Sequence, residues 1–418
     1  MKNIVIGKSF SGSPLKVEFV GNEKSSLKIF IISGQHGDEK YSQKAVSRLI
    51  NYWNHSTKHP FFAAILKNAN PDGYKAESRK NAQSIDLNRD HLLLQSQETQ
   101  AVHSFIRKWQ PKVVIDVHNY PSRRKHLLKK HLILYEDIFI DIPTHLAFIH
   151  PINSKKINEF FSHILFDLES KGLTCSRYVL FQKSGKIRHS TLDVQDARNS
   201  LALRNNLFSI LLEGREPLKK EGIVGENRTI TSQFHALCSM VDWIVQNKTI
   251  FDDDFHIPDK NELVPIAIHY KNSNDVIELQ VKNSKTKKIS KKKFKNYSPE
   301  VEISKFIKLP SAYGVPNSLS ALIELLKKQG FSSVNSPEKN RYQMYCVVPS
   351  KNKKFPNYNI KRKTVNAEIS NYTIFPTHQL GGRFLAVLLE PQSNFSLSRF
   401  PKFNLKFSKF FEYPIIRI

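Results

Sequence analysis

Residues 27–39 read LKIFIISGQHGDE, an apolar run that passes into a short turn carrying His36 and Glu39. A continuous apolar run of this length, closed by Ser33 and Gly34, is typical of a parallel strand buried on both faces. In open α/β sheets, functional side chains gather at the carboxyl ends of parallel strands. We therefore expect an α/β fold in which His36 and Glu39 lie at that edge of the sheet.

A second apolar run leads to another histidine. Residues 112–118 read KVVIDVH, which predicts a neighbouring strand that brings His118 to the same edge. Two histidines and one carboxylate suit a catalytic Zn2+, which takes three protein ligands and keeps one position open. We expect His36, Glu39 and His118 to bind one zinc ion per chain. A lone His-x-x-Glu pattern also occurs in solvated loops without a metal, so the other motifs of the chain are needed to distinguish a zinc site from such a loop.

Five motifs occur along the chain in a fixed order. Besides the two histidine motifs, they are NPDGY at 70–74, SRK at 78–80 with IDLNRD at 85–90, and LLEGR at 211–215. This order resembles the zinc carboxypeptidase family, which hydrolyses C-terminal peptide bonds, together with relatives that remove acyl groups from amino acids. The resemblance extends over residues 1–245 and includes the lead-in GKSFSGSPL at 7–15. It implies an α/β/α sandwich around a mixed, mostly parallel sheet.

Glu213 ends the apolar run 207–212 and is the candidate general base. A carboxylate emerging from a buried strand is costly unless it is used or paired. By resemblance, Glu213 takes a proton from the attacking water and hands it to the leaving nitrogen. The alternative is that Glu213 only pairs with Arg215 or a neighbouring lysine.

Arg79, Asn88 and Arg89 match positions that contact the substrate in the family. By resemblance, Arg79 polarises the scissile carbonyl, since donors aimed at a developing oxyanion stabilise the transition state. Asn88 and Arg89 are expected to clamp the C-terminal carboxylate, because arginine presents a planar fork that matches it. Without the family pattern, all three side chains would be interpreted as solvated surface groups.

Two acidic residues are candidates for orienting the histidine ligands, which usually donate their second ring proton to a carboxylate or carbonyl. By resemblance, Asp86 holds His36. Asp116 lies two residues before His118, so their side chains share a strand face. Asp116 is either a second support or the cap of a strand end.

The region before Glu213 departs from the better-known peptidases, which carry a mobile tyrosine closer to the catalytic glutamate. Tyr178, the sole tyrosine between 151 and 213, lies 35 residues ahead, so we expect that tyrosine lid to be missing. Arg198, 15 residues before Glu213, falls near the position that sets side-chain preference, which predicts binding of acidic or polar substrate side chains. The alternative is that Arg188, Arg198 and Arg204 are ordinary loop or surface charges.

The composition indicates a globular chain. With 418 residues, 40% hydrophobic and 24% charged, it is long enough for two or three domains. The apolar start is too short for a signal peptide, and no apolar stretch approaches the ~20 residues of a membrane helix. Three scattered cysteines, Cys175, Cys238 and Cys346, suggest reduced thiols. We expect a cytoplasmic protein without membrane contact.

The formal charge of +27 raises the hypothesis of nucleic-acid binding. Positive charge is densest in the run 282–295, which has eight lysines in fourteen residues. We interpret this run as a solvated hairpin or loop, since none of the recognised nucleic-acid folds is indicated, and we do not expect nucleic acid as a partner.

The sequence predicts a catalytic domain at 1–247, a linker at 248–261 and a β-rich α+β accessory domain at 262–418 of unknown role. An amphipathic helix at 234–245 closes the first part. In the second part, strands at 263–270 and 276–281 are predicted to form a hairpin, and 317–330 a helix. Among further strand-like segments, 383–391 is similar in pattern to LLE at 211–213, but no histidine pair accompanies it, so Glu390 is expected to be structural.

The leading hypothesis is a zinc metallocarboxypeptidase that acts on peptides, acidic or peptidoglycan-derived ones among them. One alternative is a zinc amidohydrolase that frees an amino acid from an N-acyl group. Both enzymes would need a substrate with a free carboxylate. A different alternative is a basic, non-catalytic binder associated with nucleic acid, in which the metal site is vestigial. The sequence does not indicate the oligomeric state.

Overall fold

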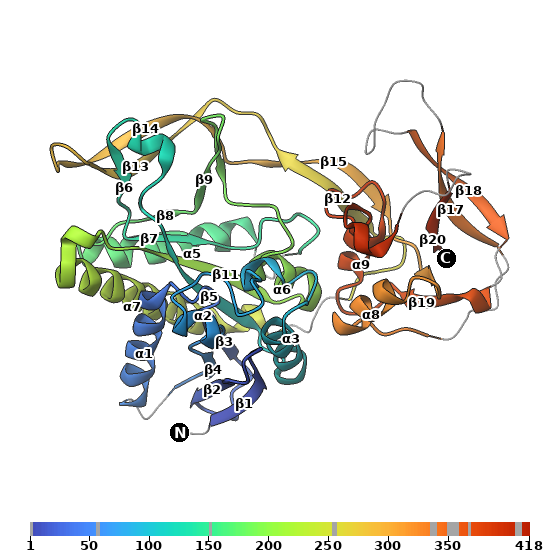
Figure 1. Ribbon diagram of the computed structural model, residues 1–418, viewed down its shortest axis with the longest axis horizontal. Coiled ribbons are helices and arrows are strands. Elements are labelled where there is room, and N and C mark those ends of the chain that lie inside the picture. Colours follow the sequence, from blue (N-terminus) through green and yellow to red (C-terminus); the bar gives the residue numbers. More distant parts are fainter. Residues whose placement is uncertain are drawn as a thin grey trace.

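The computed structural model describes residues 3–55, 59–149, 153–252, 257–334, 341–348, 359–366, 369–405 and 412–418. Figure 1 shows a layered part, in which helices flank a central sheet, and a β-rich part beside and above it.

The central sheet has eight strands in the order β1-β2-β4-β3-β5-β11-β7-β8. Their bounds are β1 Asn3–Lys8, β2 Pro14–Gly21, β3 Lys28–Ser33, β4 Phe62–Leu66, β5 Val113–Tyr120, β7 Ile138–Asp141, β8 Cys175–Arg177 and β11 Phe208–Arg215. The pairs β3–β4, β3–β5, β5–β11 and β7–β8 are parallel, and the other three are antiparallel. The predicted mixed, mostly parallel sheet is therefore confirmed.

Helices cover both faces of this sheet (Figure 1). They are α1 Lys40–Asn54, α5 Ser154–Ser170 and α7 Gly222–Gln246 on one face, and α3 Gln97–Trp109 and α6 Ala197–Asn205 on the other. In β3, Ile29 and Ile31 belong to the first core and Phe30 and Ile32 to the second, because successive strand residues point to opposite faces. The predicted α/β/α sandwich is confirmed. No helix in the described ranges is long and apolar enough to cross a lipid bilayer.

The remaining strands form three smaller sheets. A two-stranded sheet pairs β12 Leu263–Tyr270 with β15 Val301–Lys308. A five-stranded sheet contains β6 Leu132–Leu134, β13 Asp275–Asn283, β14 Ile289–Ser298, β10 Ile187–His189 and β9 Val179–Phe181. A second five-stranded sheet contains β18 Asn359–Asn366, β17 Arg341–Val348, β20 Glu412–Arg417, β16 Ala312–Pro316 and β19 Tyr372–Pro376. The helices of this part are α8 Ser320–Lys328 and α9 Gly382–Leu389.

Two expectations for this part are wrong. The strands β12 and β13 do not form a hairpin, because β12 pairs with β15, whereas β13 pairs with β14 and β6. The polar residues between β12 and β13 predict a change of chain direction, but they do not determine which strand pairs with β12. The segment 383–391 is not a strand but largely the buried helix α9, since a continuous apolar run fits a buried helix as well as a buried strand.

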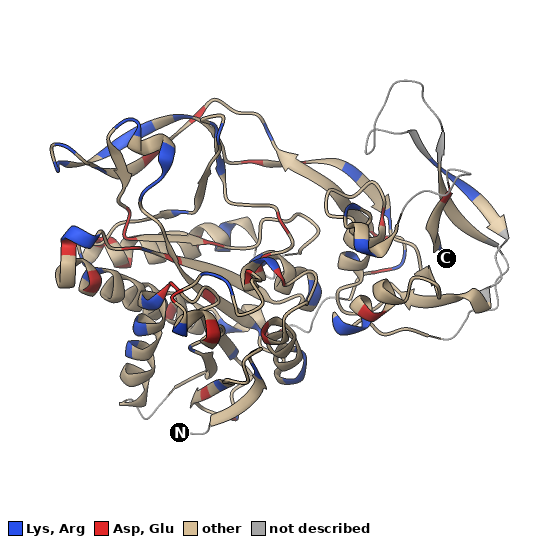
Figure 2. Ribbon diagram, in the orientation of Figure 1, with Lys and Arg blue, Asp and Glu red and all other residues tan. Residues whose placement is uncertain are grey.

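The lysine run is a hairpin, as expected. The strands β13 and β14 pair antiparallel, and Lys285, Lys287 and Lys288 in the connecting turn are exposed. Figure 2 shows the positive charges gathered along this hairpin. Lys282 differs, because its Nζ lies 3.4 Å from Glu221 Oε1 and is largely covered.

The two predicted domains share structure. The sheet that contains β13 and β14 takes β6, β9 and β10 from the first part of the chain. The hydrophobic core of the second part also includes Leu92, Val194 and Leu203. Within the predicted linker, a short 3-10 helix, η3 Lys248–Phe251, buries Phe251 in the sandwich core, and 253–256 lie outside the described residues. The domain boundaries stay a prediction, but the described contacts join the two parts closely.

A buried ion pair closes the second part of the chain. Glu390 follows α9 and is fully buried, and its Oε1 accepts hydrogen bonds from the Tyr313 hydroxyl at 2.6 Å and from the Arg417 guanidinium on β20. Arg417 also donates to the Tyr345 hydroxyl at 3.0 Å. The Glu390–Arg417 pair therefore holds four separate segments together, which is a structural role.

Replacing Arg417 by methionine should lower the free energy of unfolding by about 3–5 kcal/mol, because the Glu390 carboxylate would stay buried without its cation. Urea denaturation followed by fluorescence measures this change. The control is Arg362→Met, which removes an exposed arginine of β18 and should change stability by less than ~1 kcal/mol. Equal stabilities of the two variants would contradict the role given to the pair.

Candidate active site

The turn after β3 is shaped by backbone contacts that only glycine permits. Asn70 caps the short helix α2 Pro71–Lys75 and donates from its side chain to the Gln35 carbonyl at 3.2 Å. A Cβ atom on Gly37 would lie 2.0 Å from the Gly73 backbone carbon. The NPDGY motif therefore supplies the surface against which the turn folds, and this contact fixes the chain on either side of His36.

His36, Glu39 and His118 converge at the carboxyl edge of β3 and β5, where the sequence predicted them. Glu39 Oε1 lies 2.6 Å from His36 Nδ1, and Glu39 Oε2 lies 2.9 Å from His118 Nδ1. The two Nδ1 atoms are 3.2 Å apart, and the candidate ligand atoms all lie within 4.8 Å of one another. The backbone N–H of Asn119 donates to Glu39 Oε2 at 2.9 Å and holds the carboxylate in place.

The far side of each imidazole faces a carboxylate. His36 Nε2 lies 3.1 Å from Asp86 Oδ1, and His118 Nε2 lies 2.8 Å from Asp116 Oδ2. Because a carboxylate only accepts, each ring can place a proton on Nε2, and the Nδ1 lone pair would then be free to coordinate a metal ion between the rings and Glu39. Two nitrogen donors and one carboxylate in this arrangement fit a zinc ion.

Gln35 and two more histidines extend this network into the protein, and no sequence motif pointed to them. Gln35 Nε2 donates to Asp116 Oδ1 at 2.7 Å, and Gln35 Oε1 lies 2.8 Å from His91 Nε2. His91 Nδ1 lies 3.1 Å from His103 Nε2. Burial lowers the pKa of His91 to about 4 and that of His103 well below its ordinary value, so both rings are neutral. Donors and acceptors can therefore alternate from His103 to Asp116, which fixes the carboxylate behind His118.

Replacing Gln35 by leucine should weaken zinc binding by about 10–100-fold, the usual effect of removing a group behind a metal ligand. The change leaves Asp116 Oδ1 and His91 Nε2 without their partner. Competition with a chromophoric chelator measures the affinity. The control is Gln43→Leu, a buried glutamine on α1 whose Nε2 has no hydrogen-bond partner among the described residues. If both variants bind zinc as the wild type does, Gln35 has no part in positioning Asp116.

The charges of the cluster favour protonated histidines when no metal competes. Burial alone would lower the pKa of His36 and His118, but nearby carboxylates outweigh it. Glu39 and Asp86 raise the pKa of His36, and Asp116 and Glu39 raise that of His118 well above its ordinary value. The pKa of Glu39 is lowered, because attraction to the two rings exceeds the effect of its burial.

Zinc binding should therefore release about one to two protons per chain near pH 7, since coordinating imidazole must be neutral. The apparent affinity should rise with pH until the raised histidine pKa values are passed. Calorimetric titration in two buffers of different ionisation enthalpy measures the number of protons. Binding heats that do not depend on the buffer would contradict this arrangement of charges.

Glu213 lies beside the cluster on β11, paired in register with His118 of β5. Burial raises the pKa of Glu213 to about 7, with Glu39 adding to the rise and His118 opposing it. Within the described ranges Glu213 makes no hydrogen bond or ion pair. Arg215, its alternative partner, instead bonds to Glu221 at 2.8 Å.

The structure places the three predicted substrate contacts near this cluster. Arg79 Nε donates to Asp86 Oδ2 at 2.9 Å, and its Nη1 lies 3.7 Å from Glu39 Oε1. Asn88 and Arg89 lie in the 3-10 helix η1 Leu87–Arg89. Asn88 Oδ1 accepts from the Ala197 backbone N–H at 2.8 Å, while its Nδ2 lies 3.1 Å from His118 Nε2. Arg89 is exposed.

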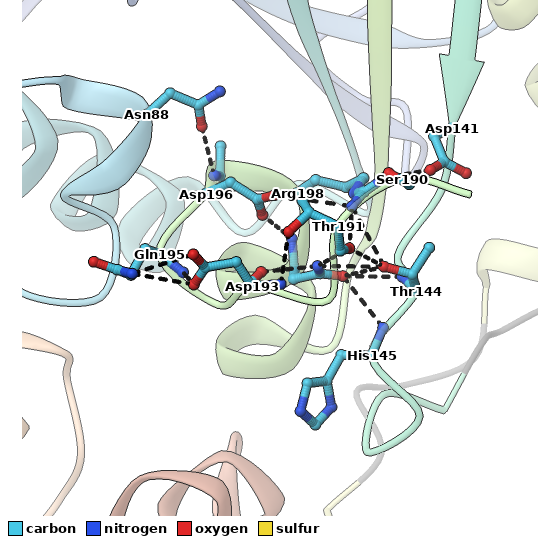
Figure 3. A network of polar contacts seen from close by, with 12 residues as sticks. Asn88, Asp141, Thr144, His145, Ser190, Thr191, Asp193, Gln195, Asp196 and Arg198 are labelled. Carbon is cyan, nitrogen blue, oxygen red and sulfur yellow. Dashed lines mark hydrogen bonds and ion pairs between the residues drawn. The ribbon is translucent and has the colours of Figure 1, made fainter. Parts of the chain in front are cut away.

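Arg198 is neither a surface charge nor a free substrate contact. It is 1% exposed, and its guanidinium bonds to Asp141 Oδ2 at 2.5 Å and to the Thr191 carbonyl at 2.8 Å, as Figure 3 shows. The binding role of Arg198 stays a prediction, and its charge is already paired with Asp141 inside the protein. Arg204 is also buried rather than exposed, and it donates to the Leu380 carbonyl at 2.8 Å.

Comparisons with known proteins agree with the motifs. Residues 1–96 match the family model described as zinc carboxypeptidase. Carboxypeptidase 2 of Trichophyton rubrum is 25% identical over 203 residues, covering 46% of this chain and 37% of the relative. Carboxypeptidase SOL1 of Arabidopsis thaliana is 30% identical over 125 residues, covering 24% of this chain and 26% of the relative. The chain thus spans little more than a third of the length of the Trichophyton relative.

A solved structure with a similar arrangement is carboxypeptidase A from Helicoverpa armigera. It has a TM-score of 0.47 at 14% identity, over 59% of this chain and 69% of that protein. The resemblance to zinc carboxypeptidases predicted from the motifs is confirmed by the family model and the curated relatives.

Proposed function

We propose that the chain is a zinc-dependent metallocarboxypeptidase that hydrolyses the C-terminal amide bond of peptides. The observation that supports this most is the convergence of His36 Nδ1, Glu39 and His118 Nδ1 beside the unpaired carboxylate of Glu213. His36, Glu39 and His118 would hold one zinc ion per chain. We also propose a cytoplasmic location, which the three free cysteines support.

When bound, zinc lowers the pKa of water toward ~7 and polarises a carbonyl group. Glu213 accepts a proton from the attacking water and delivers it to the leaving nitrogen. A carboxyl group with a pKa raised to about 7 suits both steps, since it gains and loses a proton near neutral pH.

Three side chains position the substrate in this account. Asp86 fixes the Nε edge of Arg79, so the guanidinium is preorganised to donate to the developing oxyanion. Arg89, with the Nδ2 group of Asn88, binds the free carboxylate of the substrate. Asn88 keeps its orientation because its Oδ1 is engaged by the N-terminus of α6.

The test is mass-resolved release of residues from a mixed peptide library by the zinc-loaded protein, alongside a panel of N-acyl amino acids. The proposal predicts release of single C-terminal residues from the peptides. No release from any peptide, with one zinc bound per chain, would overturn it. Cleavage of the acyl-amino acids alone would assign the same site to an amidohydrolase.

A further inference from the structure

A cavity of about 590 Å3 lies between the segment that precedes α6 and the C-terminal part of the chain. One wall consists of 191–195 together with Lys186 and Arg188. The opposite wall consists of 268–270 at the end of β12, with Asn394 and Arg399. The volume is sufficient for several residues of an extended peptide.

Hydrogen bonds hold the lining segments in place, so the cavity exists before any ligand binds. The strands β10 and β14 pair with Arg188 opposite Ser298, and Lys186 Nζ donates to Asn272 Oδ1 at 3.2 Å. On the far side, the Ile268 backbone N–H donates to Asn394 Oδ1 at 2.6 Å. Preorganised walls reduce the entropy that binding must overcome.

The charges that line the cavity favour an anion. Lys186, Arg188 and Arg399 contribute three cationic side chains, and Asp193 is the one acidic side chain among the lining residues. The Asp193 carboxylate is already engaged by Gln195, through the backbone N–H at 2.9 Å and the side-chain Nε2 at 3.1 Å. These bonds hold the carboxylate in place but do not remove its charge, so the three cations exceed the one acidic group by two positive charges.

Two buried polar atoms of lining residues lack a partner among the described residues. They are Arg188 Nε and the Tyr270 hydroxyl oxygen. The Arg188 guanidinium lies 5.7 Å from the centre of the Tyr270 ring, so the two groups stand together in the wall. Unsatisfied buried donors are rare, so the polar groups of this wall are not all used within the protein.

One chain segment connects the cavity with the predicted carboxylate clamp. The lining segment 191–195 leads directly into Asp196 and Ala197, and the Ala197 N–H bonds to Asn88 Oδ1 at 2.8 Å. The His91 N–H also donates to the Gln195 carbonyl at 3.2 Å. Figure 3 shows Gln195 and Asp193 below Asn88 on this segment. A substrate held by Asn88 therefore lies one chain segment away from the cavity.

We propose that this cavity binds a second carboxylate of the peptide substrate through Arg188 and Arg399. The inference rests on the proposed function and gives the C-terminal part a role, since Arg399 and Tyr270 come from it. The sequence pattern assigned the selection of acidic substrates to Arg198. In this proposal Arg188 and Arg399 select them instead, because no acidic partner among the described residues neutralises their charges.

The test measures binding of tetrapeptides to the zinc-loaded Glu213→Gln protein by calorimetry. Three peptides carry one glutamate each, at the first, second or third position, and their counterparts carry glutamine. At least one glutamate peptide should bind about tenfold tighter than its counterpart, the contribution of one hydrogen bond to a charged group. Both Arg399→Gln and Arg188→Gln should reduce this ratio to near one and leave binding of the glutamine peptide unchanged.

The control is Lys402→Gln, which also removes one positive charge. Lys402 is close to Arg399 in the sequence but does not line the cavity. It should keep the tenfold ratio. Equal binding of every glutamate and glutamine pair, or an equal loss of preference in the control, would overturn the inference. Hydrolysis by the wild type separates the two proposals. If the wild type cleaves peptides and binds the glutamate and glutamine peptides equally, only the proposed role of the cavity is wrong. If it prefers the glutamate peptide but cleaves no peptide, only the proposed peptidase activity is wrong.

Discussion

The Glu213→Gln variant is expected to release C-terminal residues at least ~1000-fold more slowly than the wild type, because general acid–base catalysis of this kind contributes up to about 10⁴-fold. Glutamine keeps the shape of the side chain but cannot accept the proton of the attacking water. Glu213 is not among the three candidate ligands, so one zinc per chain should remain bound. Initial rates with a peptide substrate and metal analysis of the same sample measure both quantities.

The matched control for this variant is Glu216→Gln, three residues further along the same chain segment. Its carboxylate lies outside the ligand cluster, and its pKa is raised mainly by burial. The control should retain activity within about threefold of the wild type, as expected for a group that takes no part in proton transfer. Comparable rates for the two variants would remove Glu213 from the mechanism.

The His118→Ala variant is expected to bind zinc more than ~100-fold more weakly and to lose peptide release in proportion, since it removes one of three ligands. The effect should exceed that of Gln35→Leu, which acts only behind the ligand. Equilibrium dialysis measures zinc stoichiometry, and circular dichroism verifies that the sheet is intact. His163→Ala on α5, the same change outside the cluster, should bind zinc normally. Full zinc occupancy of the His118 variant would contradict the ligand assignment.

The layered part of the fold could be predicted because the sequence patterns that indicate it lie within short stretches of the chain. The strand before His36 is buried on both faces, and so is the strand that carries His118, which fits a sheet covered by helices on both sides. Parallel strands place their carboxyl ends at one edge, so the meeting of His36, Glu39 and His118 follows from strand direction and sequence order alone. Glu213 joins them because its strand β11 pairs in parallel with β5.

Contacts between distant segments could not be predicted in this way. The partner of Arg198 is Asp141, 57 residues earlier, on a strand whose position in the sheet the sequence does not reveal. The link from Gln35 to His91 spans 56 residues, and neither residue type signals the other. The pairing of β12 with β15 skips an entire hairpin, so the turn after β12 carried no information about it. Tertiary packing decides each of these contacts.

In the proposed function, one zinc ion held by His36, Glu39 and His118 makes the chain a peptidase. The most direct measurement adds zinc stepwise to metal-free protein and follows the release of C-terminal residues from a peptide. Activity should rise linearly and stop rising at one equivalent of zinc per chain. Full activity in the metal-free protein, or none after one equivalent is bound, would contradict the proposed function.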